Sequence, residues 1–240
     1  MSRPAVPKAH STVARQGEGT PVNHHLALDV AGTRLLLLAG KAVLWPEQQV
    51  MCVADAHFGK AAAYRALGQP VPGGTTRANL ERLDLLLAAH PCRQLVFLGD
   101  FLHARASHTP GTLSALQAWR QKHPQLVCTL VRGNHDLHAG DPPLTLGIEA
   151  ANEPLVIGPF ALRHTPAVHS GLHAIAGHDH PVFALHGKGR QRLRLPCFYH
   201  QSGITVLPSF GDFTGGHAID PAPLSRVFVT DGTGVWPIGR

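Results

Sequence analysis

The chain has 240 residues, of which 44% are hydrophobic, so it can bury one substantial core, and we expect a single domain over residues 25–240. It carries 21 Lys and Arg residues against 15 Asp and Glu residues, and the net charge of +6 favours an anionic partner. The longest leucine run, Leu35–Leu38, is too short to span a bilayer, so we expect no membrane association.

Residues 1–24 are rich in Pro, Ser, Thr and Gly and have no periodic apolar positions, which predicts a mobile N-terminal segment. From Leu26 onward, short apolar runs predict strands. These runs are Leu35–Ala39, Val50–Ala54, Leu95–Leu98, Leu126–Val131, Leu155–Ile157, Phe160–Leu162, Ala174–Ala176, Ile204–Leu207 and Val227–Val229. Helices are predicted at Thr76–His90 and at Thr112–His123, with Thr112 as the N-cap.

Strand and helix alternate in the first half of the chain, whereas the second half is mostly strands and turns. This order predicts an α/β fold in which two sheets form a layered β-sandwich flanked by helices. The four cysteines are widely spaced, form no CxxC motif and lie mostly in apolar runs, so we expect reduced thiols and a cytoplasmic protein.

Four polar motifs follow apolar runs that predict strands. They are Asp55-Ala56-His57, Gly99-Asp100, Gly133-Asn134-His135-Asp136 and Gly177-His178-Asp179-His180. Each motif alone is explained as well by an ordinary turn, because Asp, Asn and Gly favour turns for local reasons. Ligands of α/β sheets gather beyond the carboxyl ends of strands, however, so the motifs can converge on one site. With 18 histidines in the chain, a site rich in imidazole ligands is the stronger hypothesis.

In this order the motifs resemble the calcineurin-like metallophosphoesterase superfamily, whose signature runs D-x-H, G-D, G-N-H-D/E, H and G-H-x-H. The resemblance covers residues 55–180 and implies the fold of that superfamily and two divalent ions. It assigns one ion to Asp55, His57, Asp100 and His180, and the other to Asp100, Asn134, His164 and His178. Asp100 is then the bridging ligand.

The isolated histidine of the signature has three candidates, His164, His169 and His173. We select His164, because Phe160–Arg163 predicts a strand that delivers it, and we rank His169 second.

The chemistry of this donor set fits hydrolysis of phosphate esters. Two divalent ions and two carboxylates leave a net charge of about +2, which attracts a phosphate ester. A water shared by both ions would lose a proton near neutral pH and attack phosphorus as a metal-bridging hydroxide. Nitrogen and oxygen donors suit manganese, iron or zinc, and the resemblance favours manganese.

The same resemblance gives His135 a catalytic role beside the substrate, as a donor of a proton or hydrogen bond. In the phosphatase branch of the superfamily an Asp three residues after the bridging Asp orients this histidine. Here His103 stands at that position, as a histidine does in the DNA-repair nuclease branch, so we assign His103 to the catalytic pair. This substitution favours phosphodiester over phosphomonoester hydrolysis.

Three further stretches narrow the resemblance to the bacterial ligase-associated DNA damage response endonuclease family. They are residues 55–60, residues 64–72 and the glycine-rich residues 208–216, which also have a simpler explanation as a turn closing the second sheet. The resemblance implies a DNA endonuclease or phosphodiesterase of the DNA damage response, with DNA, a DNA ligase, a helicase and an exonuclease as partners.

Basic residues near the motifs are candidate contacts for substrate phosphate, namely Lys60, Arg65, Arg105 and Arg132. Alternate basic residues at Lys188, Arg190, Arg192 and Arg194 form one basic edge if the segment is a strand, which could follow a phosphate backbone. A solvated hairpin protected from edge pairing by its charge explains them equally well.

Two other functions remain compatible with the sequence. A phosphatase or small-molecule phosphodiesterase, such as one acting on nucleotides, could use the same residues. A non-catalytic scaffold is the weakest hypothesis, because every expected type of metal ligand is present.

Overall fold

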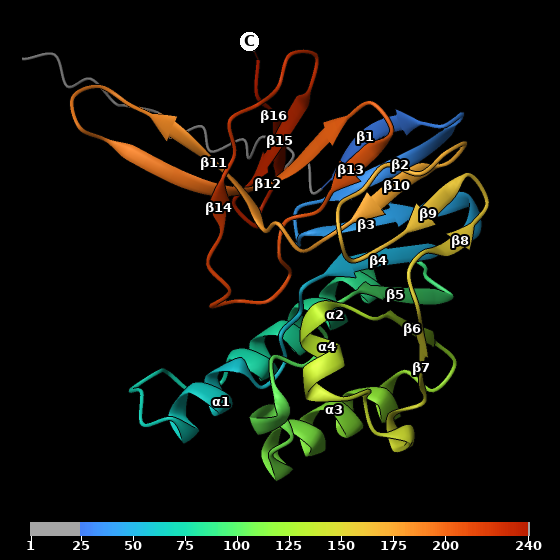
Figure 1. Ribbon diagram of the computed structural model, residues 1–240, viewed down its shortest axis with the longest axis vertical. Helices are drawn as coiled ribbons and strands as arrows, with labels where there is room; N and C mark the ends of the chain where they lie inside the picture. Colours follow the sequence, from blue (N-terminus) through green and yellow to red (C-terminus); the bar gives the residue numbers. More distant parts are fainter. Residues whose placement is uncertain (1–24, 240) are drawn as a thin grey trace, which may run out of the picture.

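The computed structural model describes residues 25–239, and the segment predicted to be mobile, residues 1–24, lies outside this range. Two β-sheets are stacked on each other, and the helices cover the outer face of the first sheet (Figure 1). The predicted layered α/β sandwich is therefore confirmed, with its helices confined to one side. Among the described residues, no helix is long and apolar enough to cross a bilayer.

The first sheet has seven strands in chain order. They are β1 (His25–Val30), β2 (Thr33–Leu38), β3 (Ala42–Trp45), β4 (Val50–Ala54), β5 (Gln94–Leu98), β6 (Val127–Val131) and β7 (Ile148–Ala151). The first four strands pair antiparallel, whereas β4, β5, β6 and β7 are parallel. Parallel neighbours need crossover connections, and helices make most of them.

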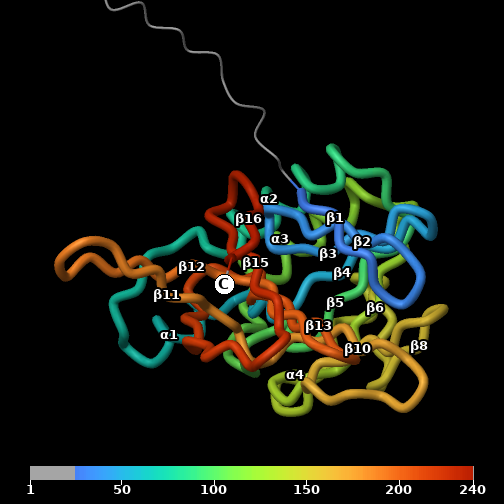
Figure 2. The backbone as a smooth tube through the Cα atoms, turned by 90° about the horizontal axis from the view of Figure 1, so that it is seen from above, coloured from blue at the N-terminus to red at the C-terminus, as the bar shows by residue number. Residues whose placement is uncertain are grey.

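The second sheet has nine strands, most of them short. Its path is β14 (His217–Ala218), β11 (Pro181–His186), β12 (Arg192–Gln201), β13 (Ile204–Val206), β10 (His173–Ala176), β9 (Phe160–Leu162) and β8 (Leu155–Ile157). Two more strands extend from β12: β15 (Arg226–Thr230) pairs with β12, and β16 (Val235–Pro237) pairs with β15. Seen from above in Figure 2, the β11–β12 hairpin extends beyond the rest of the fold on the same side as α1.

Four α-helices and three short 3-10 turns complete the described chain. They are α1 (Lys60–Ala66), α2 (Thr75–Ala89), α3 (Pro110–Lys122), α4 (Asn134–Ala139), η1 (Pro46–Gln48), η2 (Arg105–Ser107) and η3 (Leu144–Leu146). The two predicted helices correspond to α2 and α3, but the predicted N-cap Thr112 is wrong. Thr109 caps α3, and its hydroxyl accepts the Thr112 N–H at 3.2 Å. Pro110 follows it because the first helical position needs no N–H donor.

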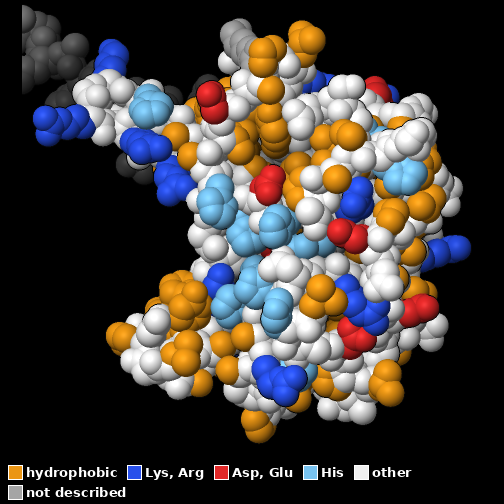
Figure 3. Space-filling view, in the orientation of Figure 1, with side chains coloured by type: hydrophobic (Ala, Val, Ile, Leu, Met, Phe, Trp, Pro, Cys, Tyr) orange, Lys and Arg blue, Asp and Glu red, His pale blue; other side chains and the backbone are white. Residues whose placement is uncertain are grey.

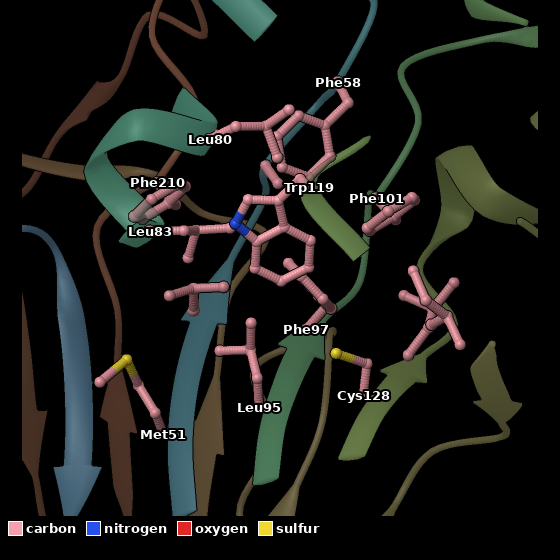
Figure 4. Close-up of a cluster of buried hydrophobic side chains, with 14 of the residues drawn as sticks. Met51, Phe58, Leu80, Leu83, Leu95, Phe97, Phe101, Trp119, Cys128 and Phe210 are labelled. Atoms are coloured by element: carbon pink, nitrogen blue, oxygen red, sulfur yellow. The ribbon is translucent and has the colours of Figure 1, made fainter. Parts of the chain in front are cut away.

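The central strands are buried on both faces, so their side chains alternate between two cores. Met51 and Val53 of β4 face the helices, whereas Val50, Cys52 and Ala54 face the second sheet. In the helix-side core, Leu83 and Trp119 pack over Phe97 and its neighbours (Figure 4). The two cores hold β4 and β5 in place from both sides, which fixes the ends of these strands.

The cysteines agree with the prediction of reduced core residues. All four are free, and Cys52, Cys128 and Cys197 are buried while Cys92 is half-buried. Burial raises the pKa of Cys52 and of Cys197 to about 12, so these thiols stay protonated at neutral pH.

Truncating Leu83 to alanine should test the helix-side core. Leu83 is 0% exposed, so Leu83→Ala should lower the free energy of unfolding by about 2–5 kcal/mol in urea denaturation. Leu85 of the same helix is 72% exposed, and Leu85→Ala should change stability by less than about 0.5 kcal/mol. Equal effects of the two variants would contradict the described packing of α2.

Candidate metal centre

The polar motifs meet at the carboxyl ends of the central strands. Asp55 directly follows β4, Asp100 follows β5 after one glycine, and Asn134 begins α4 just beyond β6. From the second sheet, β10 delivers His178 and β9 delivers His164. The parallel strands end at one edge of the first sheet, so residues far apart in sequence become neighbours.

Asp55 and Asp100 form the buried base of this site, at 0% and 2% exposure. His57 Nε2 lies 3.6 Å from Asp100 Oδ2, and His180 Nε2 lies 3.4 Å from Asp55 Oδ1. Both imidazole nitrogens are buried, and neither has a hydrogen-bond partner within residues 25–239. Burial is the main cause that lowers the pKa of His57 well below its usual range, so its ring is neutral.

A second group of donors surrounds His164. Its Nδ1 lies 3.1 Å from the Leu98 carbonyl, which can only accept, so Nδ1 carries the proton and Nε2 carries the lone pair. That Nε2 lies 2.8 Å from Asn134 Oδ1, 2.9 Å from His178 Nδ1 and 3.5 Å from Asp100 Oδ1. Lone pairs of nitrogen and oxygen therefore converge on a small space.

These contacts fit a pair of divalent cations. Donor atoms within 4.8 Å of one another form three potential metal-binding groups, Asp55–His57–His180, Asp55–Asp100–His164 and His57–His103–His135. Unpartnered imidazole nitrogens beside buried carboxylates are stabilised by a cation, since each otherwise loses its solvation without compensation. His169, the second-ranked histidine, belongs to none of these groups within residues 25–239, whereas His164 lies in the cluster.

Most of the expected ligands have a strained backbone. Asp55, His57, Asp100, His178 and His180 all have positive φ angles, of 54°, 45°, 51°, 71° and 46°. This left-handed conformation is unfavourable for residues with a Cβ atom, and it clusters at functional sites. In this conformation the backbone bends directly after the strand, so the side chains there lie over the end of the strand.

Two glycines allow the close approach of the motifs. A Cβ atom on Gly133 would lie 2.5 Å from Asp100 Oδ1, and one on Gly177 would lie 2.7 Å from Asp55 Oδ2. The glycines that precede the third and fourth motifs therefore make room for the two carboxylates.

Asp136 is a site residue for which the sequence analysis predicted no role. Its carboxylate is buried and accepts the backbone N–H groups of Asp100, Phe101 and Gly133 at 2.7, 2.9 and 2.8 Å. Burial raises the pKa of Asp136 to about 6, although these N–H donors oppose the rise. Asp136 thus joins the third motif to the second. Its position as the last residue of the third motif is the feature of the sequence that could have indicated this role.

The glycine-rich stretch of residues 208–216 holds the first motif rather than simply closing the second sheet. The Phe210 N–H donates to the Ala54 carbonyl at 2.7 Å, and both Ser209 Oγ and the Gly211 N–H donate to the Asp55 carbonyl at 3.0 Å. Arg82 of α2 donates to the Phe210 carbonyl at 2.6 Å. The stretch therefore connects Asp55 to both sheets and to α2.

His103 contacts His135 in two ways, by a hydrogen bond to its main-chain carbonyl and by stacking of its ring. Its Nδ1 donates to the His103 carbonyl at 2.6 Å, and its Nε2 points toward Asp100 Oδ2 at 4.0 Å. The His103 imidazole instead stacks on the His135 ring, with centroids 4.9 Å apart, and Tyr64 stacks on its other face at 5.6 Å. The carbonyl thus occupies the place of the missing carboxylate partner.

The predicted phosphate-binding residues differ in their distance from the site and in the bonds that they already make. Lys60 begins α1. Burial lowers its pKa, and the negative charges of Asp100 and Asp55 partly oppose this, so Lys60 lies close enough to the two carboxylates to interact with them. Arg65 donates to the Val71 and Pro72 carbonyls, and Arg105 is exposed in η2.

The guanidinium of Arg132 already forms hydrogen bonds within the protein. Its guanidinium makes two bonds of 2.7 Å to the carboxylate of Asp141 and one of 2.9 Å to Asn152 Oδ1. The expectation that it binds substrate phosphate is therefore disfavoured, since it would have to give up these bonds.

The predicted basic edge at Lys188–Arg194 is not one strand. Arg192 and Arg194 belong to β12, whereas Lys188 and Arg190 lie in the turn that follows β11. The segment is therefore the turn and the returning strand of a hairpin, not a single basic strand.

Histidine side chains crowd into the hollow between the hairpin and the lower lobe of the molecule (Figure 3). Asn134 and His178 are exposed there, while Asp55 and His57 are buried. A ligand would therefore approach from the side of Asn134 and His178.

Comparison with known proteins agrees with this geometry. No family model matches the chain, and no curated protein matches it. Among solved structures, nuclease MPE of Pseudomonas putida is 48% identical with a TM-score of 0.79, over 89% of this chain and 100% of that chain. A phosphoesterase of E. coli, Yfce, is 16% identical over 79% of this chain and 97% of that chain, with a TM-score of 0.39 too low to support an argument.

The fold and the site define a metallophosphoesterase, an enzyme that hydrolyses phosphate esters with divalent metal ions. The resemblance inferred from the motifs is thereby confirmed. The chain belongs to the family of the Pseudomonas putida nuclease MPE.

Replacing Asp136 with asparagine should loosen the site without removing a proposed metal ligand. An amide offers one acceptor oxygen to three N–H groups, so Asp136→Asn should cost about 2–3 kcal/mol of stability, measured by urea denaturation. Asp220 is exposed, and Asp220→Asn makes the same chemical change without effect. Unchanged stability of the Asp136 variant would show that these bonds do not join the motifs.

Proposed function

We propose that this chain is a DNA phosphodiesterase, an endonuclease, that works with two divalent ions at the candidate metal centre. The observation that carries the proposal is the position of Asp100. Its Oδ2 faces His57 Nε2 at 3.6 Å, while its Oδ1 faces His164 Nε2 at 3.5 Å, as a carboxylate that bridges two cations would. The relation to a nuclease at 48% identity supports the same function.

The proposed ligand sets follow the two groups of donors. Asp55, His57, Asp100 and His180 would hold one ion, and Asp100, Asn134, His164 and His178 would hold the other. The chemistry that such a pair supplies is activation of water near neutral pH and stabilisation of charge on the phosphoryl oxygens. We propose manganese, because the donors are nitrogen and oxygen without thiolate, with iron and zinc as alternatives.

The chain itself holds and orients the imidazole that would act on the ester. Because the Nδ1–H of His135 donates a hydrogen bond to the His103 carbonyl, Nε2 is the ring nitrogen that faces the candidate metal centre. In its protonated form this Nε2–H can donate to the leaving oxygen or to a non-bridging oxygen of the phosphate. The stacked rings of Tyr64 and His103 limit rotation of His135.

The partner of His135 favours a diester as substrate. A neutral carbonyl stands where the phosphatase branch of the superfamily has a carboxylate, so this position adds no negative charge beside the substrate. A diester carries one negative charge and needs no anchor for a phosphate dianion. Lys60, at the border of the centre, is the proposed contact for that single charge, with Arg65 and Arg105 as more distant candidates.

The biological setting is proposed from the family resemblance. We assign the protein to the DNA damage response in the cytoplasm, where a reducing environment would keep its four cysteines free. A DNA ligase, a helicase and an exonuclease are the proposed partners, since the related endonucleases are associated with those activities.

A side-by-side assay tests the substrate class. With manganese, the purified protein should hydrolyse a simple diester and DNA faster than a monoester, and chelation should abolish all turnover, because the ions activate the nucleophile. Metal analysis should give two ions per chain, and Asp100→Asn should remove turnover together with at least one ion. A preference for monoesters, with no cleavage of DNA at low salt, would favour the phosphatase alternative.

Removing the His135 imidazole should separate metal binding from catalysis. His135→Ala should retain both ions but slow diester hydrolysis by about 10²–10⁴-fold, because it removes a proton donor and not a proposed ligand. His138 lies one helical turn further on, exposed and bonded to the Asn134 carbonyl, so His138→Ala serves as the control. Parallel loss of metal and rate in the His135 variant would instead make His135 a ligand.

A further inference from the structure

The hairpin of β11 and β12 begins immediately after His180 and carries an unusual surface. Every residue from His186 to Arg194 is exposed, so among residues 25–239 the outer half of the hairpin lies outside the packed core. The paired strand portion, Pro181–His186, spans about 20 Å at about 3.3 Å per residue. The hairpin therefore projects away from the rest of the fold, as Figure 1 shows.

Within residues 25–239, the positive charges of this arm, residues Pro181–Gln201, have no carboxylate partner. No acidic residue occurs between Asp179 and Asp212. Among the described residues, Lys188, Arg190 and Arg192 take part in no ion pair or side-chain hydrogen bond, whereas Arg82 and Arg132 pair with carboxylates. Clustered cations without partners attract an external polyanion.

The register of the hairpin puts Arg192 and Arg194 on one face, and Lys188 and Arg190 lie in the turn at its tip. His186 pairs with Arg192, and Ala184 pairs with Arg194, so these side chains share a face. The opposite face is apolar, with Leu193 opposite Leu185. At its base the apolar face continues to Phe183 and Leu195, which pack against the core of β15 and Cys197.

The basic face lies on the side of the candidate metal centre. Arg194 donates to the Gly216 carbonyl at 2.6 Å, next to β14. The adjacent His217 reaches back to the Asp179 carbonyl at 3.1 Å, and its ring lies 6.5 Å from that of His180. In Figure 3 Lys and Arg side chains lie along the arm, and those at its base lie beside the histidine cluster.

We propose that this arm binds the sugar–phosphate backbone of the DNA strand on one side of the cleaved bond, an inference that rests on the proposed nuclease function. A stacked strand advances about 3.4 Å per nucleotide, so an arm of about 20 Å covers about six nucleotides. The contacts are to phosphate, so they give reach and affinity without base specificity. The arm makes the enzyme favour polymers over small diesters.

The test is the triple variant Lys188→Gln, Arg190→Gln and Arg192→Gln in the full chain. Its control is Arg34→Gln, Arg93→Gln and Lys122→Gln, which lowers the net charge equally at exposed positions outside the arm, where Arg34 and Lys122 form surface ion pairs with Asp29 and Asp84. Binding of DNA of about 24 and about 4 nucleotides is measured by fluorescence anisotropy over a range of salt, without added metal. Turnover of a small diester is measured separately with manganese.

The arm variant should bind the long DNA at least about tenfold more weakly, with a salt slope flatter by about 2–3 for the three lost charges. Its binding of the short DNA and its turnover of the small diester should stay at the wild-type level, as should all properties of the control variant. Equal behaviour of the arm and control variants on long DNA would overturn the proposal. So would binding of anionic lipid vesicles through the arm while DNA binding is unaffected.

A shortened arm tests reach independently. Leu185 and Leu193 are cross-strand partners, so an Asn-Gly turn can replace residues 186–192 without changing the register. This variant should lose the advantage of long over short DNA, and retaining that advantage would overturn the proposal. Wild-type protein that binds long DNA through the arm but cleaves no DNA would refute the nuclease function and leave the arm as a binding surface.

Discussion

Two carboxylates buried within one small volume set the conditions that the rest of this structure meets. Asp55 and Asp100 lie at 0% and 2% exposure, and both share a donor group with His164 within 4.8 Å. Such charges are strongly unfavourable in a protein interior unless they are paired or bound to cations. Burial keeps the His57 imidazole neutral, so it supplies no positive charge, and divalent ions are the compensation that this donor set fits.

The surrounding chain keeps the carboxylates in this costly arrangement. Parallel strands β4 and β5 end side by side, with hydrophobic cores on both faces. Asp136 fixes the backbone of Asp100, and the stretch around Phe210 fixes that of Asp55. Each of these contacts lies outside the set of proposed ligands, yet each determines where a ligand points.

Much of this could be predicted from the sequence, because strongly periodic or fully apolar segments and ordered polar motifs are local signals. Val50–Ala54 gave a strand, and the position of Asp55 directly after it gave a site at the end of that strand. The N-cap was misplaced by three residues, since Thr109 and Thr112 are equally good capping residues and Pro110 decides between them. The short helices α1 and α4 escaped prediction because seven or six residues carry too little periodicity.

The contacts that orient His135 and Arg132 could not be predicted, because they depend on spatial neighbours that no local pattern specifies. His103 was expected to act through its imidazole, but its main-chain carbonyl holds His135. Any residue at position 103 provides that carbonyl, so sequence alone cannot reveal it. Arg132 looked available beside a motif, and its pairing with Asp141 depends on the course of the chain beyond α4.

The clamp formed by Ser209, Phe210 and Gly211 on Asp55 has a consequence for the order of biosynthesis. The candidate centre draws on residues from 55 to 180, and its first motif is held by residues 209–211, so no early portion of the nascent chain contains it. These contacts are long-range, and they form only after the loops between them close. Binding of metal at the complete centre would therefore come late in folding, after most of the chain has left the ribosome, and would require that both sheets have docked.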